Sequence, residues 1–137
     1  MRNVASVSQV SEAIRTALRA IQGLRVVEYI PDSLNPPMAS VGADTVTYHG
    51  AFGAGNPVYQ FTVSVVVARS SERMAQKRLD DFLSYDGPLS IREALEADPT
   101  LCDIVQTCQV VSGGNITNIN VNDVVYLSVE FAVEVYA

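Results

Sequence analysis

The sequence predicts an α+β domain, in which about three helices pack on one face of a mostly antiparallel sheet of four or five strands. Strand-like alternation of apolar and polar residues recurs along the chain, and strands outnumber helices. A regular strand–helix–strand order, typical of a parallel sheet, is absent from the pattern. The 137 residues suit a single domain spanning 1–137, and 48% hydrophobic residues suit a packed core.

Two segments carry the clearest strand pattern. In the first, 59–68, the residues expected on the buried face are Tyr59, Phe61, Val63, Val65 and Val67. In the second, 124–136, they are Val125, Leu127, Val129, Phe131, Val133 and Val135. Period-2 alternation places the intervening polar residues on the opposite face of the sheet. Further strands are expected at 24–30, 39–49 and 104–112.

Three segments have helical signals. Apolar residues step by three and four through 4–22, and Gly23 is expected to end that helix. Ser70 or Ser71 is expected to cap a second helix, whose apolar positions are Met74, Ala75, Leu79, Phe82 and Leu83. After a break at 86–88, residues 90–93 read Ser-Ile-Arg-Glu, a capping box that predicts the start of a third helix.

Two connections are candidates for partner contact. Residues 50–57 are rich in glycine, and residues 112–123 are rich in asparagine, which predicts a projecting loop. The candidate contact residues are Phe52 and Asn56 in the first segment and Ile116, Ile119 and Val121 in the second. Apolar side chains in long loops are either offered to a partner or tucked under the loop, and both alternatives are open here.

Short sequence features suggest a family. They are Pro31-Asp32, Asn35-Pro36-Pro37, the strand ending in Arg69, Ala75-Gln76 before Leu79-Asp80, Gly87-Pro88, and the stretch from Ala94 to Leu101. In this order the chain resembles the small tail terminator (tail completion) proteins of long-tailed bacteriophages (siphoviruses), especially those of actinobacterial hosts. The features cover nearly the whole chain.

The resemblance implies a structural virion protein without enzymatic activity or cofactor. Its expected form is a ring of copies of itself, commonly a hexamer, at the head-proximal end of the tail. Its expected partners are the tail tube protein, whose growth it stops, and the head-side connector or head-closure protein. DNA would pass through the ring without specific binding, and the ring would assemble in the host cytoplasm.

Charge is unevenly distributed along the chain. The net charge of −6 argues against nucleic-acid binding as the main activity, because phosphate contacts need clustered Lys and Arg. Residues 1–78 carry a net charge of +3, and residues 79–137 carry −9. If these halves form opposite sides of the subunit, copies can associate head to tail. The alternative is that the charges simply lie on solvated helix faces.

Glu130 and Glu134 lie on the polar face of the last strand. If this face lined the channel of a ring, the carboxylates would make the lumen negative, which would repel DNA phosphates. The alternative is a solvated face without such a role.

Signals of catalysis or metal binding are weak. The single histidine, His49, has no motif that supplies a nucleophile or an acidic partner. The glycines at 50–55 lack the Lys-Ser/Thr of a phosphate-binding loop, and the two cysteines, Cys102 and Cys108, lack the further ligands of a zinc site. We expect both cysteines to be buried, reduced thiols, and neither a metal nor a catalytic residue.

The given sequence also lacks the ~18-residue apolar run of a membrane helix and the cationic-then-apolar pattern of a secretory signal. We therefore expect a soluble protein with no membrane partner. Two alternatives to the terminator hypothesis stay open. One is another neck component, such as a head-closure or minor tail protein. The other is a small ligand-binding or enzymatic α+β domain, which predicts a pocket and a stable monomer.

Overall fold

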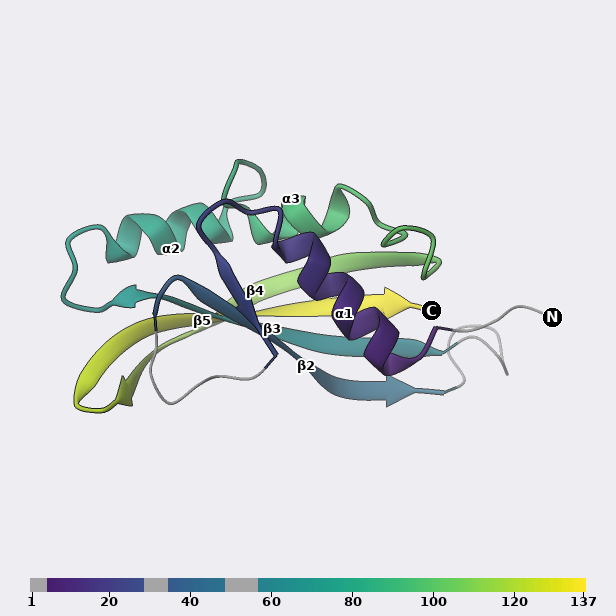
Figure 1. The fold of residues 1–137 in the computed structure, drawn as a ribbon, viewed down its shortest axis with the longest axis horizontal. Helices are drawn as coiled ribbons and strands as arrows, with labels where there is room; N and C mark the ends of the chain where they lie inside the picture. The colour runs from purple at the N-terminus through teal and green to yellow at the C-terminus, as the bar shows by residue number, and fades with distance from the viewer. Residues whose placement is uncertain (1–4, 29–34, 49–56) are drawn as a thin grey trace.

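The computed structural model describes residues 5–28, 35–48 and 57–137. Within them the chain forms helices and strands in the order α1 (Val7–Leu18), β1 (Arg25–Val27), β2 (Met38–Thr47), β3 (Val58–Arg69), α2 (Ala75–Leu83), α3 (Ile91–Glu96), β4 (Thr107–Val121) and β5 (Val124–Tyr136) (Figure 1).

The strands form one mixed sheet in the order β1-β2-β3-β5-β4. The short β1 is parallel to β2, and the other neighbouring strands are antiparallel. The C-terminal strand β5 therefore lies inside the sheet, between β3 and β4. The predicted α+β class and mostly antiparallel sheet are confirmed.

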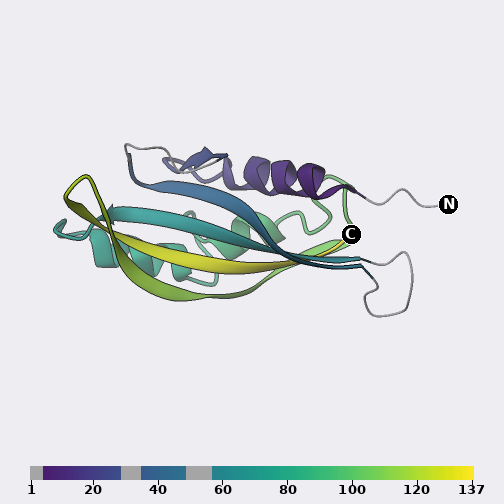
Figure 2. The same ribbon diagram turned by 90° about the horizontal axis from the view of Figure 1, so that it is seen from below.

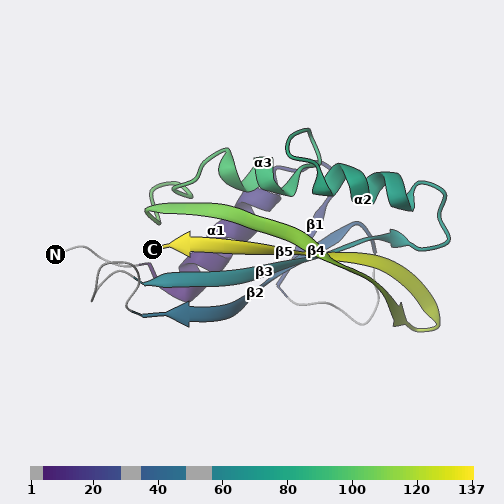
Figure 3. The same ribbon diagram turned by 180° about the vertical axis from the view of Figure 1, so that it is seen from behind.

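The helices cover one face of this sheet. Viewed from below, α2 and α3 lie behind the strands (Figure 2), and viewed from behind, the strands lie in front of α1 (Figure 3). The buried side chains of the helices join those of the covered sheet face in one core, which includes Ile14, Leu18, Phe61, Val63, Val65, Leu79, Phe82, Ile91, Leu95, Val129 and Phe131. The alternation expected for β3 is confirmed as far as Val65, since Phe61, Val63 and Val65 are at most 1% exposed. Beyond it the expectation is wrong, because Val66 is buried and a register shift between Val66 and Ala68 brings Ala68 into the core.

The ends of the first two helices differ from expectation. Helix α1 ends at Leu18, and it begins at Val7 because Ser6 and Gln9 form a reciprocal capping box there. Helix α2 begins only at Ala75, and neither Ser70 nor Ser71 caps it. The reason lies in the sheet, since both the backbone N–H and the hydroxyl of Ser70 donate hydrogen bonds to the carbonyl oxygen of Val125.

Met74, expected in the core, precedes α2 and is 50% exposed. At α3, the predicted cap is confirmed in part. The Ser90 hydroxyl accepts from the backbone N–H of Glu93, as expected. The Glu93 carboxylate, however, accepts from the backbone N–H of Gly87, in the preceding turn, instead of completing the box.

The prediction of a projecting loop at 112–123 is wrong. Strand β4 begins at Thr107 rather than at 104, continues through this segment to Val121, and pairs with β5 along its length. Asn122 and Asp123 form the connection, with φ of 52° and 64°. Asn and Asp tolerate this left-handed conformation, which matches the twist of a tight hairpin. The polar, glycine-containing sequence thus encodes a bulged edge strand rather than a loop.

Gly113 shows why glycine is needed in this strand. A Cβ at this position would lie 2.8 Å from Cδ2 of Leu83 and 2.8 Å from Cε1 of Phe131. Phe131 is 3% exposed and packed in the core, so its ring has little room to move. Gly113 therefore lets β4 approach α2 closely.

We expect Gly113→Ala to destabilise the fold by about 1–3 kcal/mol, the usual cost of overpacking a core. Urea unfolding followed by circular dichroism measures the difference. Gly114→Ala is the matched control, because a Cβ there meets nothing within 4 Å. Equal stability of the two variants would contradict the close approach of α2 and β4.

Candidate functional site

The face of the sheet opposite the helices carries a row of polar residues, and we call it the open sheet face; Met38, Val66 and Tyr126 lie on the same face and are buried. Paired residues in neighbouring strands share a face, so the register assigns its members. They include Ser40, Thr45, Gln60, Thr62, Ser64, Ser128, Glu130, Ala132 and Glu134, all exposed or half-buried. The cross-strand neighbours of the two carboxylates are uncharged: Ser64 and Gly114 flank Glu130, and Gln60 and Gln109 flank Glu134.

Both carboxylates also accept a hydrogen bond from a nearby side chain. Glu130 accepts a hydrogen bond of 2.9 Å from the Asn115 side-chain amide, which fixes a bulged residue with a φ of 51°. Glu134 accepts from the Tyr136 hydroxyl, and this hydrogen bond raises the pKa of that hydroxyl. In the described residues neither carboxylate forms an ion pair.

Of the five predicted contact residues, the structure describes three. Ile116, Ile119 and Val121 lie on β4, not in a loop. Ile116 is 50% exposed and lies where the register between β4 and β5 shifts, whereas Ile119 and Val121 are half-buried. Phe52 and Asn56, like His49, lie outside the described residues.

One end of the molecule combines exposed apolar and basic side chains, and we call it the hairpin end. It consists of Val125, which follows the β4–β5 turn, and of Arg69 and Arg73, which end and follow β3, together with the exposed Asp123 of the turn; Ile116 lies farther along β4, level with the middle of β5. Val125 is 39% exposed, and its carbonyl oxygen holds the turn between β3 and α2 through Ser70. Both arginines are exposed, and neither forms an ion pair within the described part of the chain.

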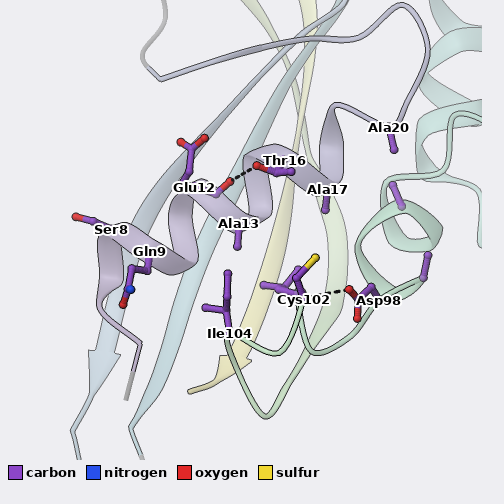
Figure 4. A pocket seen from close by; sticks show the side chains of 13 residues that line it. Ser8, Gln9, Glu12, Ala13, Thr16, Ala17, Ala20, Asp98, Cys102 and Ile104 are labelled. Carbon is purple, nitrogen blue, oxygen red and sulfur yellow. Dashed lines mark hydrogen bonds between the residues drawn. The ribbon is translucent and has the colours of Figure 1, made fainter. Parts of the chain in front are cut away.

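A groove with a volume of about 670 Å³ lies between α1, α3 and the segment that follows α3 (Figure 4). We call it the alanine groove, because its apolar lining consists of Ala13, Ala17, Ala20, Ala94, Ala97, Leu101 and Ile104. Ala13 and Ala17 of α1 face Ile104 and Cys102 across it. Sequence reasoning missed this site. The signal was the spacing of Ala13 and Ala17 in α1 and of Ala20 just after it, but small apolar residues at helical spacing indicate burial as readily as a groove.

An unusual turn forms one wall of the groove. Leu101, Cys102 and Asp103 have φ of 50°, 60° and 65°, a left-handed run that is sterically unfavourable for side chains with a Cβ. Asp98 holds this run, since its carboxylate accepts 2.8 Å from the Cys102 backbone N–H and 3.0 Å from the Thr100 hydroxyl. These hydrogen bonds lower the pKa of Asp98, so its carboxylate stays ionised at neutral pH.

The two cysteines have different surroundings, which corrects the expectation that both are buried. Both are free thiols, but Cys102 is exposed and lines the groove, whereas Cys108 is buried. Burial raises the pKa of Cys108 to about 11. The Asp98 carboxylate raises the pKa of Cys102, first by a hydrogen bond that stabilises the thiol and then by its negative charge, which disfavours the thiolate. Neither environment activates a nucleophile.

The described residues contain no group of three or more His, Cys, Asp or Glu side chains placed to hold a metal ion. Within the same ranges, no helix is long and apolar enough to cross a membrane.

No protein-family model matches the chain, and a search of curated proteins finds no match either.

The thiol environments predict alkylation rates. Because only the thiolate reacts, the raised pKa of Cys102 shifts its pH–rate profile with iodoacetamide above that of a free cysteine. Asp98→Asn removes the charge, so the profile should shift to lower pH and the rate at pH 8 should rise. Asp44→Asn, an exposed carboxylate on β2, is the control. Mass spectrometry should show Cys108 unmodified until the protein unfolds, and an unshifted Asp98→Asn profile would contradict the assigned cause.

Proposed function

We propose that this protein is a tail terminator of a long-tailed bacteriophage, a non-catalytic subunit of a ring that caps the tail tube and joins it to the head-side connector. The proposal starts from the sequence resemblance to that family. The observation that carries it further is the open sheet face, whose polar row bears two carboxylates, Glu130 and Glu134, that form no ion pair within the described residues.

A carboxylate-bearing face suits the wall of a DNA channel. Glu130 and Glu134 lie four residues apart on β5, with uncharged side chains on the strands beside them. Repeated around a closed ring, they would form negative bands that repel phosphates, so DNA would slide without binding. Their hydrogen bonds to Asn115 and Tyr136 hold the carboxylates in place on this face.

The mechanism we propose is geometric. Copies join through two different surfaces, as a closed ring requires. One ring face contacts the last layer of tube protein and the other contacts the connector. Tube growth stops because the outer ring face differs from the surface that the tube protein presents. Another neck component, such as a head-closure or minor tail protein, would share this architecture and differ in its partners.

The alanine groove favours a second candidate, the binding of a small apolar ligand by a monomer. Its volume of about 670 Å³ lies within the range of small-molecule sites, and its lining is mostly apolar. Few polar groups converge on it, however, and specific ligand sites use such groups to orient the ligand. Oligomeric state separates the two candidates.

Light scattering coupled to size-exclusion chromatography, with negative-stain imaging of the same fractions, tests the proposal. We expect closed rings of uniform diameter as protein concentration rises, with or without Mg²⁺. A monomer under all conditions that copurifies with a small apolar molecule would instead favour the ligand-binding candidate.

The channel assignment makes a separate prediction for the rings. Glu130→Lys with Glu134→Lys should convert weak or absent binding of duplex DNA into salt-sensitive binding, measured by fluorescence anisotropy. Glu130→Gln with Glu134→Gln is the matched control, since the amide oxygens can still accept from Asn115 and Tyr136. Lysine-variant rings that bind DNA no better than wild-type rings would contradict a lumen position for this face.

A further inference from the structure

We infer that strand β4 has a free edge able to pair with a second copy of itself, and that the chain covers this edge with the side chain of Glu96. By the free edge we mean the side of β4 that is turned away from β5. Among the strands that the structure describes, β4 pairs with β5 alone and lies at one end of the strand order. The inference goes beyond the proposed function and does not depend on it.

The directions of the backbone groups identify a donor on the free edge. The backbone N–H of Ala137 donates to the carbonyl oxygen of Pro57 and thus faces β3. Because direction alternates along an antiparallel strand, Glu134 faces β4, where it pairs with Gln109. Val110, next to Gln109, therefore directs its backbone N–H to the free edge.

The carboxylate of Glu96 covers this donor. One oxygen accepts 3.0 Å from the backbone N–H of Val110, and the other accepts 3.0 Å from Arg92, one turn earlier on α3. Arg92 is held in turn by Tyr85, whose carbonyl oxygen accepts from its Nε at 2.7 Å and whose ring lies 3.6 Å from its guanidinium. Both oxygens of Glu96 are therefore engaged, and α3 lies beside β4 (Figure 3).

The sequence of β4 explains why such a cover is needed. Edge strands usually resist pairing because they carry charged side chains or proline. None of the 15 residues from Thr107 to Val121 is charged or is proline. Register shifts after Val110 and after Gly114 interrupt the ladder farther along the strand. The stretch before them is regular, and Glu96 supplies the charge that it lacks.

A second copy of the same stretch fits this edge. A two-fold axis beside β4 makes the strand antiparallel to its copy, so the outward backbone groups of Cys108 in one chain meet those of Val110 in the other. Gln109 then lies opposite the Gln109 of the copy. Val111, which is 56% exposed, adjoins this stretch and lines a hollow of about 270 Å³ together with Tyr85. Pairing would therefore bury apolar surface as well as backbone groups.

Glu96 and a paired copy exclude one another. Val110 has a single backbone N–H, which cannot serve the carboxylate and a carbonyl oxygen of a second strand at the same time. Loss of Glu96 should therefore open the edge to a second chain, with the rest of the sheet unchanged.

Disulfide trapping tests the pairing. In a chain with Cys102→Ser, which removes the exposed native thiol, Gln109→Cys introduces one exposed thiol on β4. Opposed Cα atoms of a non-hydrogen-bonded pair lie about 4.5 Å apart, within the range that a disulfide allows. Under mild oxidation, Glu96→Ala in this chain should raise the yield of linked dimer about tenfold or more, the factor expected when a hydrogen bond to a charged group is lost.

Two controls accompany this test. Glu93→Ala removes another α3 carboxylate, one that accepts from the backbone N–H of Gly87 outside the sheet, and should leave the dimer yield unchanged. Thr45→Cys in place of Gln109→Cys puts the thiol at an exposed position of β2 and should give no dimer with Glu96→Ala. Circular dichroism establishes that each chain is folded before oxidation.

Hydrogen exchange tests the cover itself. The amide of Val110 should exchange slowly in the wild-type chain and about tenfold or more faster in Glu96→Ala, measured by mass spectrometry at single-residue resolution. Arg92→Ala is a second variant for use if Glu96→Ala does not fold. It keeps Glu96 but removes the group that fixes it, so it should raise both the exchange rate and the dimer yield to a smaller extent.

Three results would overturn the inference. Dimer yields that are equal with and without Glu96 would show that this side chain does not close the edge. Equal yields from Glu96→Ala and Glu93→Ala would assign the linkage to a general loosening of α3. Rapid exchange of the Val110 amide in the wild-type chain would show that the edge is already open.

Discussion

Burial of the sheet on one face is the constraint on which the rest of this structure depends. Alternate residues of β3 and β5, such as Val63, Val65 and Val129, are fully buried, and all three helices pack on the face that they form. Since the helices occupy that face, the opposite face must be compatible with water. Much of it is, because Gln60, Thr62 and Ser64 of β3 and Ser128, Glu130 and Glu134 of β5 lie on that face, although Val66 and Tyr126 on the same face are buried.

Polar contacts of α3 fasten the helical layer to the edge of the sheet. The carboxylate of Glu96 accepts 3.0 Å from the backbone N–H of Val110, next to a bulge of β4. Its other oxygen accepts from Arg92, whose guanidinium lies 3.6 Å above the Tyr85 ring. The buried Ser90 hydroxyl donates to the carbonyl oxygen of Ser84 and so joins the ends of α2 and α3. These contacts position the segment after α3, and with it one wall of the alanine groove.

The functional surfaces follow from the same arrangement. The open sheet face, the hairpin end and the alanine groove are three separate surfaces of one subunit, and none of them carries an activated nucleophile or a metal-binding cluster among the described residues. Such a subunit has the means to contact several neighbours at once. That property is what a structural ring component needs, and it agrees with the physical argument for the proposed function.

The sequence by itself determined the parts of this protein that depend on local periodicity. The alternation in β3 and β5 and the apolar stripe of α1 identified most of the core and placed Glu130 and Glu134 on the polar face, because side-chain direction in a strand or helix follows residue spacing. Tertiary structure decided what depends on distant residues. Strand β4 passes through a glycine- and asparagine-rich segment because pairing with β5 and the carboxylate of Glu130 stabilise it, and Ser70 bonds to Val125 instead of capping α2. The alanine groove likewise exists only where α1 meets the chain that follows α3, since no local pattern encodes the space between segments that are some 80 residues apart.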